Sequence, residues 1–174
     1  MSIYLETERL ILCEYEYSDF DALKAIISDK EIMSHFPSPY DDEGVKHWIS
    51  WSRKGYLTYG YGFLAVILKS SGQLIGNAGI TPQNIHGVTR PEIGYHFNKA
   101  YWHQGYASEA THALKRWGFV TFNFEALFSY MDKDNLPSIA VAKRNGMHLV
   151  DSYFDHGEDL LVYSISIKEF INQK

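Results

Sequence analysis

A run of small residues, Gly105-Tyr106-Ala107-Ser108, stands where a predicted strand and turn give way to a helix. Small residues at such a junction let a ligand approach the backbone closely. The first N–H groups of a helix have no partner within it, and the helix dipole adds positive partial charge at the same end. The junction therefore favours an anionic group, with phosphate as the obvious candidate, although glycine before a helix also occurs in ordinary turns.

A second predicted helix start also carries polar side chains. Asn135 stands at an N-cap position, and Leu136-Pro137 fits a first turn that needs no N–H, so Ser138 takes the third helical position. Lys143 and Arg144 lie near the other end of this helix, where its dipole favours cations. Local rules alone make Asn135 a helix cap and leave the two cations in solvent.

Apolar periodicity and turn residues predict strands and helices along the whole chain. Ser70-Ser71-Gly72 and residues 155–158 each separate two apolar runs, which predicts two antiparallel hairpins, and a polar loop is expected over 82–91. The order of elements fits a mixed sheet covered by helices better than a simple doubly wound sheet. The expected strands are 9–15, 61–69, 73–81, 92–97, 126–131, 147–154 and 159–167, and the expected helices are 19–27, 41–54, 106–121 and 135–146.

Length and composition limit the class of protein. With 174 residues, 45% of them hydrophobic, the chain can bury one substantial core, and we expect a single domain over residues 1–174. A net charge of −5 argues against a non-specific nucleic-acid binder. The one cysteine, Cys13, excludes an intrachain disulfide and is expected to be a small buried side chain. Without a signal-peptide pattern or a span of about 20 apolar residues, we expect a cytoplasmic protein with no membrane partner.

Four segments resemble the GCN5-related N-acetyltransferase (GNAT) family, and most closely its branch that acetylates ribosomal-protein N-termini. They are residues 6–12, 74–77, 92–110 and 135–147, and they occur in the family's order across nearly the whole chain. The resemblance implies an α+β GNAT fold, with a central mixed, mostly antiparallel sheet of six to seven strands flanked by about four helices. It also implies acetyl-CoA as co-substrate, an amine acceptor, no metal, and a monomer or homodimer.

In the family, a loop of Arg or Gln, two residues, Gly, one residue, and Gly or Ala holds the pyrophosphate of acetyl-CoA. Gly105 and Ala107 match it, whereas Trp102 stands where Arg or Gln is usual. The loop acts mainly through backbone N–H groups, so this departure affects one side-chain contact more than CoA binding. By resemblance the cofactor-binding residues are Tyr95, His96, Phe97, His103, Gln104, Gly105, Tyr106, Ala107, Ser108, Asn135, Ser138 and Lys143.

Within that set the resemblance assigns different parts of the cofactor. The backbone of residues 95–97 would pair with the pantetheine arm as an added strand does. Asn135 would cap its helix and also contact pantetheine. Lys143 or Arg144 would reach the adenosine phosphates.

Amine acetylation needs a proton acceptor, a donor to the developing oxyanion and a proton source for the thiolate. Glu92 matches the Glu of the resembled branch and is the candidate base, acting directly or through a water, with a structural hydrogen bond or ion pair as the alternative. Many family members carry a Tyr acid at the position of Ala142, so the hydroxyl of Ser138 is the candidate replacement. The N–H of Phe97 would stabilise the oxyanion, where the family's strand carries a bulge.

We therefore expect an N-acetyltransferase that moves acetyl from acetyl-CoA to a primary amine. Direct transfer in a ternary complex is favoured because no poised cysteine is present. The acceptor is a protein N-terminal α-amine or a small amine such as a polyamine, an amino acid or an aminoglycoside. A non-catalytic acyl-CoA sensor and a nucleotide-binding module are alternatives of other classes. Eight histidines without metal-ligand spacing predict no metal site.

Overall fold

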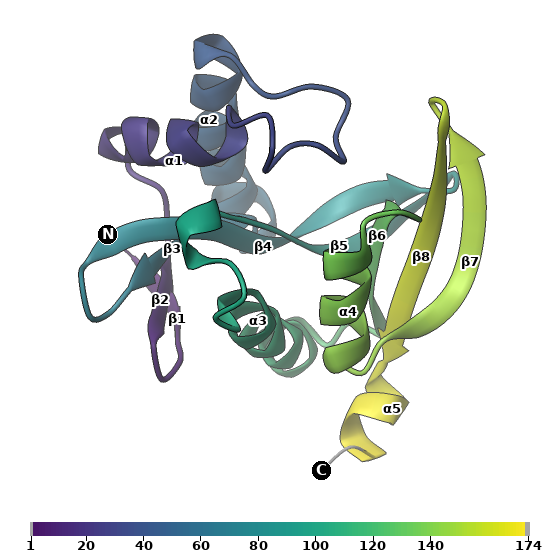
Figure 1. Cartoon of the computed structure of the whole chain (residues 1–174). Helices are drawn as coiled ribbons and strands as arrows, with labels where there is room; N and C mark the ends of the chain where they lie inside the picture. Colours follow the sequence, from purple (N-terminus) through teal and green to yellow (C-terminus); the bar gives the residue numbers. More distant parts are fainter. Residues whose placement is uncertain (1, 173–174) are drawn as a thin grey trace.

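One mixed sheet runs through the part of the chain that the computed structural model describes, residues 2–172. Its strand order is β1-β2-β3-β4-β5-β6-β8-β7, and every neighbouring pair is antiparallel except β5 with β6 (Figure 1). The strands are β1 Ile3–Glu6, β2 Leu10–Cys13, β3 Phe63–Leu68, β4 Gln73–Ile85, β5 Val88–Phe97, β6 Ala126–Asp132, β7 His148–Asp155 and β8 Glu158–Ser166.

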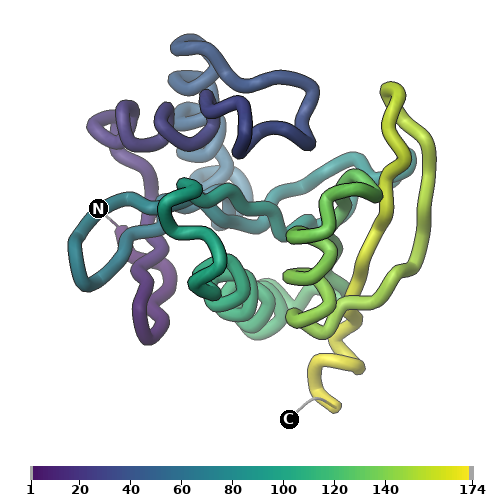
Figure 2. Tube along the Cα trace, viewed as in Figure 1, coloured from purple at the N-terminus to yellow at the C-terminus, as the bar shows by residue number. Residues whose placement is uncertain are grey.

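Helices cover both faces of this sheet (Figure 1). Each face has its own apolar core: one contains Leu23 and Val45 from the first two helices, and the other contains Leu114 and Ala142 from the next two. Figure 2 shows the chain between α1 and α2 running out over the sheet on the side of those helices. The helices are α1 Phe20–Ile27, α2 Asp42–Tyr59, α3 Tyr106–Phe122, α4 Leu136–Arg144 and α5 Ile167–Asn172, with short 3-10 helices at Tyr17–Asp19 and Lys99–Tyr101.

The expected α+β architecture, a mixed and mostly antiparallel sheet flanked by helices, is present, and so are both expected hairpins. The expectation of a loop over residues 82–91 is wrong, because β4 and β5 stay paired as far as Ile85 and Val88. Pro82 and Pro91 oppose each other in this ladder. They form a non-hydrogen-bonded pair of the antiparallel ladder. The β4–β5 pairing therefore loses no hydrogen bond through the N–H groups that the two prolines lack.

Three further differences lie at element ends. The eighth strand is β1, a four-residue segment that the apolar pattern did not predict. Helix α2 continues past its expected end at Lys54, through Gly55, and ends at Tyr59, where Gly60 caps it with φ 78°. Burial of Tyr56 in the core offsets the poor helix propensity of that glycine. Ile167, expected to end a strand, begins α5.

Strands β5 and β6 separate almost as soon as they meet. Their only register pair is Glu92 with Phe128, beside which the Ser129 hydroxyl donates to the Ile93 carbonyl at 2.8 Å. Backbone groups alternate sides along a strand, so those of Tyr95 and of residue 97 face the opening. The backbone of residue 96 faces β4 instead.

The bulge expected near Phe97 is absent from the pairing with β4. The register runs without a shift from Gly76 opposite Phe97 to Ile85 opposite Val88. Just beyond it, the N–H of Asn98 donates to the Ile75 carbonyl at 2.9 Å. The free strand edge therefore comes from the departure of β6 and not from an irregularity in β5.

No helix within residues 2–172 is long and apolar enough to cross a lipid bilayer.

Gly79 tests how closely β3 and β4 pack. A Cβ there would collide with the Gly62 carbonyl oxygen and lie 2.5 Å from the Phe63 Cα. Because both atoms belong to the backbone, we predict that Gly79→Ala lowers the free energy of unfolding by about 3 kcal/mol, measured by urea denaturation. The control is Gly72→Ala, where no atom lies within 4 Å and only φ of +69° opposes alanine. Its expected cost is about 1 kcal/mol, and an equal loss at both positions would contradict this account.

Candidate active site

A cleft of about 520 Å³ enters the molecule where β5 and β6 separate. Its walls come from the segment between α1 and α2, from α2, β5, β6 and α4, and from the turn between β7 and β8. The structure brings five of the predicted site residues into this lining and leaves Phe97, residues 103–108 and Lys143 outside it. The five are Glu92, Tyr95, His96, Asn135 and Ser138.

Glu92 is a buried carboxyl without a partner. The residue is 7% exposed, and no hydrogen bond or ion pair within residues 2–172 involves its side chain. Burial raises its pKa to about 8. A side chain at Gly94 would come within 2.9 Å of Glu92 Oε2 and 2.8 Å of Phe63, so glycine keeps the surface beside the carboxyl open. The alternative of a structural ion pair or hydrogen bond finds no support in the described residues.

Asn135, Ser138 and Tyr95 lie on the opposite side of β5. Asn135 caps α4 as predicted, since its Oδ1 accepts from the Ser138 N–H at 3.2 Å. Burial raises the pKa of Tyr95 to about 12, and the nearby Ser138 hydroxyl and Arg144 partly oppose that effect. The neutral phenol of Tyr95 therefore lies beside the Ser138 hydroxyl. Sequence reasoning missed this contact because it gave Tyr95 only a backbone role.

His96 points to the side of α1 and α2. Its Nδ1 lies 3.0 Å from Oδ1 of the buried Asn77, its cross-strand neighbour on β4. Burial lowers the pKa of His96 to about 4, so the imidazole is neutral. Rings of Phe36, Trp48 and Phe63 surround it, with centroids 4.8, 5.6 and 6.1 Å away.

The α3 start has the free N–H groups that its sequence predicted. Gly105 adopts φ 83° before the first turn, and the backbone N–H groups of residues 103–108 make no hydrogen bond within the described chain. Trp102, the atypical residue, donates its indole N–H to the Phe97 carbonyl at 2.8 Å. It therefore ties the loop back to the end of β5 and occupies that carbonyl while leaving the N–H of Phe97 available.

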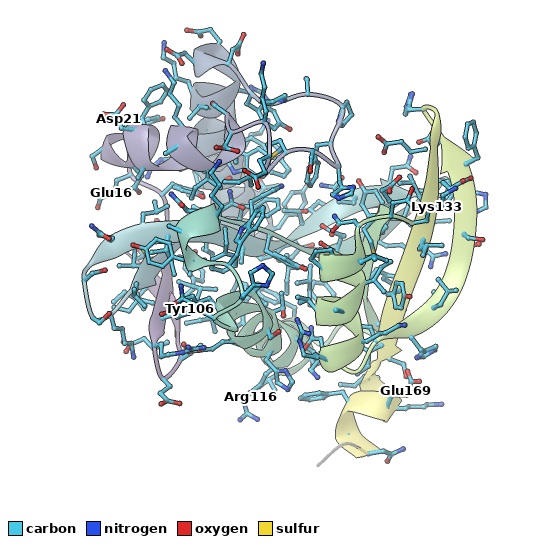
Figure 3. The ribbon with its side chains drawn as sticks, viewed as in Figure 1. Glu16, Asp21, Tyr106, Arg116, Lys133 and Glu169 are labelled. Atoms are coloured by element: carbon cyan, nitrogen blue, oxygen red, sulfur yellow. The ribbon has the colours of Figure 1, made fainter. Side chains whose placement is uncertain are left out.

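Arg9 and Glu109 support this loop, and sequence reasoning gave neither of them a role. The Glu109 carboxylate accepts from Arg9 Nε at 2.6 Å and from the Arg9 N–H at 2.9 Å. Arg9 Nη1 also donates to the Gln104 carbonyl at 3.0 Å, and the guanidinium covers the Tyr106 ring at 4.4 Å. Figure 3 labels Tyr106 at the beginning of α3. Both residues fall inside segments that carry the family resemblance, which was the available signal.

Two further observations concern charge and reactivity. Arg144 Nε lies 3.0 Å from the Ser108 hydroxyl and links the end of α4 to the start of α3, and Arg144 and Lys143 are both exposed. Cys13 is buried as expected, and burial raises its pKa to about 11. Such a thiol is a poor nucleophile at neutral pH, which agrees with transfer that uses no cysteine.

The α+β fold, the open edge of β5 and the free N–H groups at the start of α3 are the features that the resemblance to acetyltransferases implied. A sequence profile of the Acetyltransferase (GNAT) domain matches residues 9–148. The chain therefore belongs to the GNAT acetyltransferase family. This match confirms the family resemblance and the expected enzyme class, an acetyl-CoA-dependent N-acyltransferase.

Individual relatives agree with this assignment. YnaD of Bacillus subtilis, an uncharacterized N-acetyltransferase, is 32% identical over 146 residues, which cover 83% of this chain and 82% of YnaD. An acetyltransferase from Agrobacterium tumefaciens has a TM-score of 0.82 at 31% identity, with 95% of each chain covered. RimL, a ribosomal L7/L12 α-N-protein acetyltransferase solved with coenzyme A, has a TM-score of 0.79 at 19% identity, covering 97% of this chain and 99% of its own. That last likeness shows a shared fold.

The burial of Glu92 predicts a stability that depends on pH. The carboxyl ionises near pH 4.5 in the unfolded chain but near pH 8 in the folded protein. As pH rises between these values, the unfolded state loses the proton first, so this group removes stability across that window. We predict that Glu92→Gln raises the free energy of unfolding at pH 8 by on the order of 2–5 kcal/mol and changes little at pH 4.5.

Urea denaturation at the two pH values measures the effect. The matched control is Glu8→Gln, which changes an exposed carboxyl and should give no such pH-dependent gain. A Glu92→Gln protein that is no more stable than the parent at pH 8 would show that the carboxyl is solvated or paired.

Proposed function

We propose that this protein transfers the acetyl group of acetyl-CoA to a primary amine directly, within a ternary complex. The observation that carries the proposal is the unpartnered, buried carboxyl of Glu92 at the point where β5 loses its neighbour. A carboxyl with a pKa of about 8 suits proton transfer from an ammonium group near neutral pH. The backbone groups of Tyr95 and the N–H of Phe97, which have no neighbouring strand, lie farther along β5.

The cofactor half of the proposal rests on the free N–H groups at the start of α3. The N–H groups of residues 103–108 would hold the pyrophosphate, with Arg9 fixing the loop through the Gln104 carbonyl. The pantetheine arm would lie along the open edge of β5 and reach Asn135 at the start of α4. We assign the adenosine phosphates to Arg144, which contacts this loop through Ser108, together with Lys143.

Each residue then has a defined part in the reaction. Glu92 accepts a proton from the ammonium form of the acceptor, and the resulting amine attacks the thioester carbonyl carbon. As the C–N bond forms, the N–H of Phe97 donates to the oxyanion. The C–S bond then breaks, and the departing thiolate takes a proton from the Ser138 hydroxyl. The second proton leaves the nitrogen and restores the Ser138 hydroxyl, and Glu92 then releases its proton to solvent, so the products are the neutral amide, CoA as its thiol and one proton.

Glu92→Gln tests the base. We predict that kcat falls by about 10²–10⁴-fold, because the amide cannot accept the proton, while the Kd for acetyl-CoA measured by calorimetry stays unchanged. In the parent protein, kcat/KM for the amine should rise with pH through about 8, and the variant should keep only the rise that comes from deprotonation of the amine itself. Glu8→Gln serves as the control with normal turnover. Unchanged turnover of the Glu92→Gln protein would remove the base assignment.

Arg9→Ala tests the cofactor loop. Losing the contacts to Glu109 and to the Gln104 carbonyl should loosen the N–H groups, so we predict that the Kd for acetyl-CoA rises about tenfold. At saturating acetyl-CoA, kcat should change by less than threefold. The control is Arg116→Ala, which removes an exposed arginine farther along α3 (Figure 3). An equal effect of both substitutions would mean that general charge attracts the cofactor.

The acceptor itself is proposed as a primary amine, either a protein N-terminal α-amine or a small amine. Screening amines and N-terminal peptides for CoA release tests this point. Binding of acetyl-CoA without release by any amine would favour a sensor, and competition by ATP or NAD would favour a nucleotide-binding module. We further propose a single cytoplasmic domain, acting as a monomer or homodimer, and the free buried Cys13 is consistent with a reducing compartment.

A further inference from the structure

Two buried ring nitrogens in the cleft lack hydrogen-bond partners. They are Nε1 of Trp48 and Nε2 of His96, and neither is bonded within residues 2–172. Both residues line the cleft, although they are only 9% and 6% exposed. A buried polar atom without a partner destabilises the folded protein. Two such atoms in neighbouring rings therefore indicate a group that joins them in the working enzyme.

The two nitrogens are complementary. An indole nitrogen can only donate. The imidazole of His96 is neutral, and its Nδ1 carries the proton toward Asn77 Oδ1, so Nε2 presents a lone pair. With ring centroids 5.6 Å apart, the pair offers one donor and one acceptor to the same ligand. An amide group matches this pair, because its carbonyl accepts and its N–H donates.

The surroundings disfavour a negatively charged group next to the acceptor's amine. The four carboxyl residues in the cleft lining are Glu92, Asp132, Asp155 and Glu158, and neither lysine nor arginine belongs to that lining within the described chain. These groups repel a carboxylate. Phe36 and Phe63 also enclose the imidazole in an apolar box, which favours an uncharged partner.

The position of this pair relative to the proposed base fits one small acceptor. His96 and Glu92 point to the same face of β5, with Gly94 between them. Their Cα atoms are four residues apart, about 13 Å along the strand, and both side chains line the same cleft as Trp48. An acceptor amine at Glu92 therefore lies in the cleft that also contains the Trp48 and His96 rings.

We propose that Trp48 and His96 form a subsite for an uncharged amide, so that the acceptor is an α-amino amide, as at the N-terminus of a peptide. The Trp48 N–H donates to the carbonyl of that amide, and His96 Nε2 accepts from its N–H. This inference rests on the proposed function, since it describes the acceptor end of the same cleft.

Glycinamide, isobutylamine and glycine test the subsite by CoA release. Glycinamide and isobutylamine have the same shape, but only the former carries an amide, and glycine replaces that amide by a carboxylate. We expect the parent protein to show a kcat/KM at least tenfold higher for glycinamide than for isobutylamine, with glycine the poorest. Trp48→Phe and His96→Phe should each lower the glycinamide-to-isobutylamine ratio about tenfold, while His96→Gln, which keeps an acceptor, should retain part of it.

Comparing this ratio between the parent and each variant removes effects of amine basicity and of partial misfolding. Thermal unfolding and the Kd for acetyl-CoA show that each variant is folded, and the two positions give independent tests. If Trp48→Phe and His96→Phe both show the same glycinamide-to-isobutylamine ratio as the parent, the subsite is overturned. If the parent acetylates isobutylamine and shows no preference for glycinamide, the subsite inference is overturned but the proposed function stands. Acetyl-CoA binding without CoA release from either amine counts against the proposed function, and the inference falls with it.

Discussion

Strands β5 and β6 share a single register pair, Glu92 with Phe128, and the site depends on that limit. Continued pairing would cover the edge of β5 and consume the backbone groups of Tyr95 and Phe97. Because β6 departs, the backbone groups of Tyr95 and the N–H of Phe97 have no neighbouring strand, while β4 pairs with the other edge of β5. The same departure exposes the two faces of β5 differently, with Glu92 and His96 toward α2 and Tyr95 toward α4.

An opening between two strands stays at a fixed width only if other contacts span the two halves of the sheet. At one end, Lys115 donates to the Asn145 carbonyl at 2.7 Å and so joins α3 to the end of α4. At the other end, His86 at the tip of the β4–β5 hairpin lies 2.8 Å from Asp151 and stacks on Tyr153 of β7. The cleft is therefore held from both sides, which favours preformed geometry over closure on binding.

Local rules predicted the parts of the fold that short-range chemistry determines. Asn135 as a cap, Gly105 before α3 and the turn at residues 155–158 all follow from backbone preferences. Tertiary contacts decide the rest. Four residues of β1 carry too little pattern to predict a strand, and the apolar contacts of Tyr56 extend α2 past Gly55.

The site shows the same division. Glu92 and the N–H groups before α3 could be proposed from sequence because a motif in one segment carries them. Arg9 supports the loop from a strand far away in the chain, and the pairing of Trp48 with His96 joins α2 to β5. Such contacts depend on side-chain packing between distant segments, for which a single sequence gives no local signal.

Burial and function oppose each other along β5. A protein selected only for stability would place an apolar residue at position 92 and a paired or apolar residue at position 96, because unpartnered polar groups weaken the core. Here both groups are held against the open cleft by rigid neighbours: Gly94 leaves room beside the carboxyl, and Asn77 fixes the imidazole from the far side. The unpartnered polar groups of Glu92 and His96 lie where β5 loses its neighbour. The regular β4–β5 ladder on the other edge of β5 lets the fold tolerate their energetic cost.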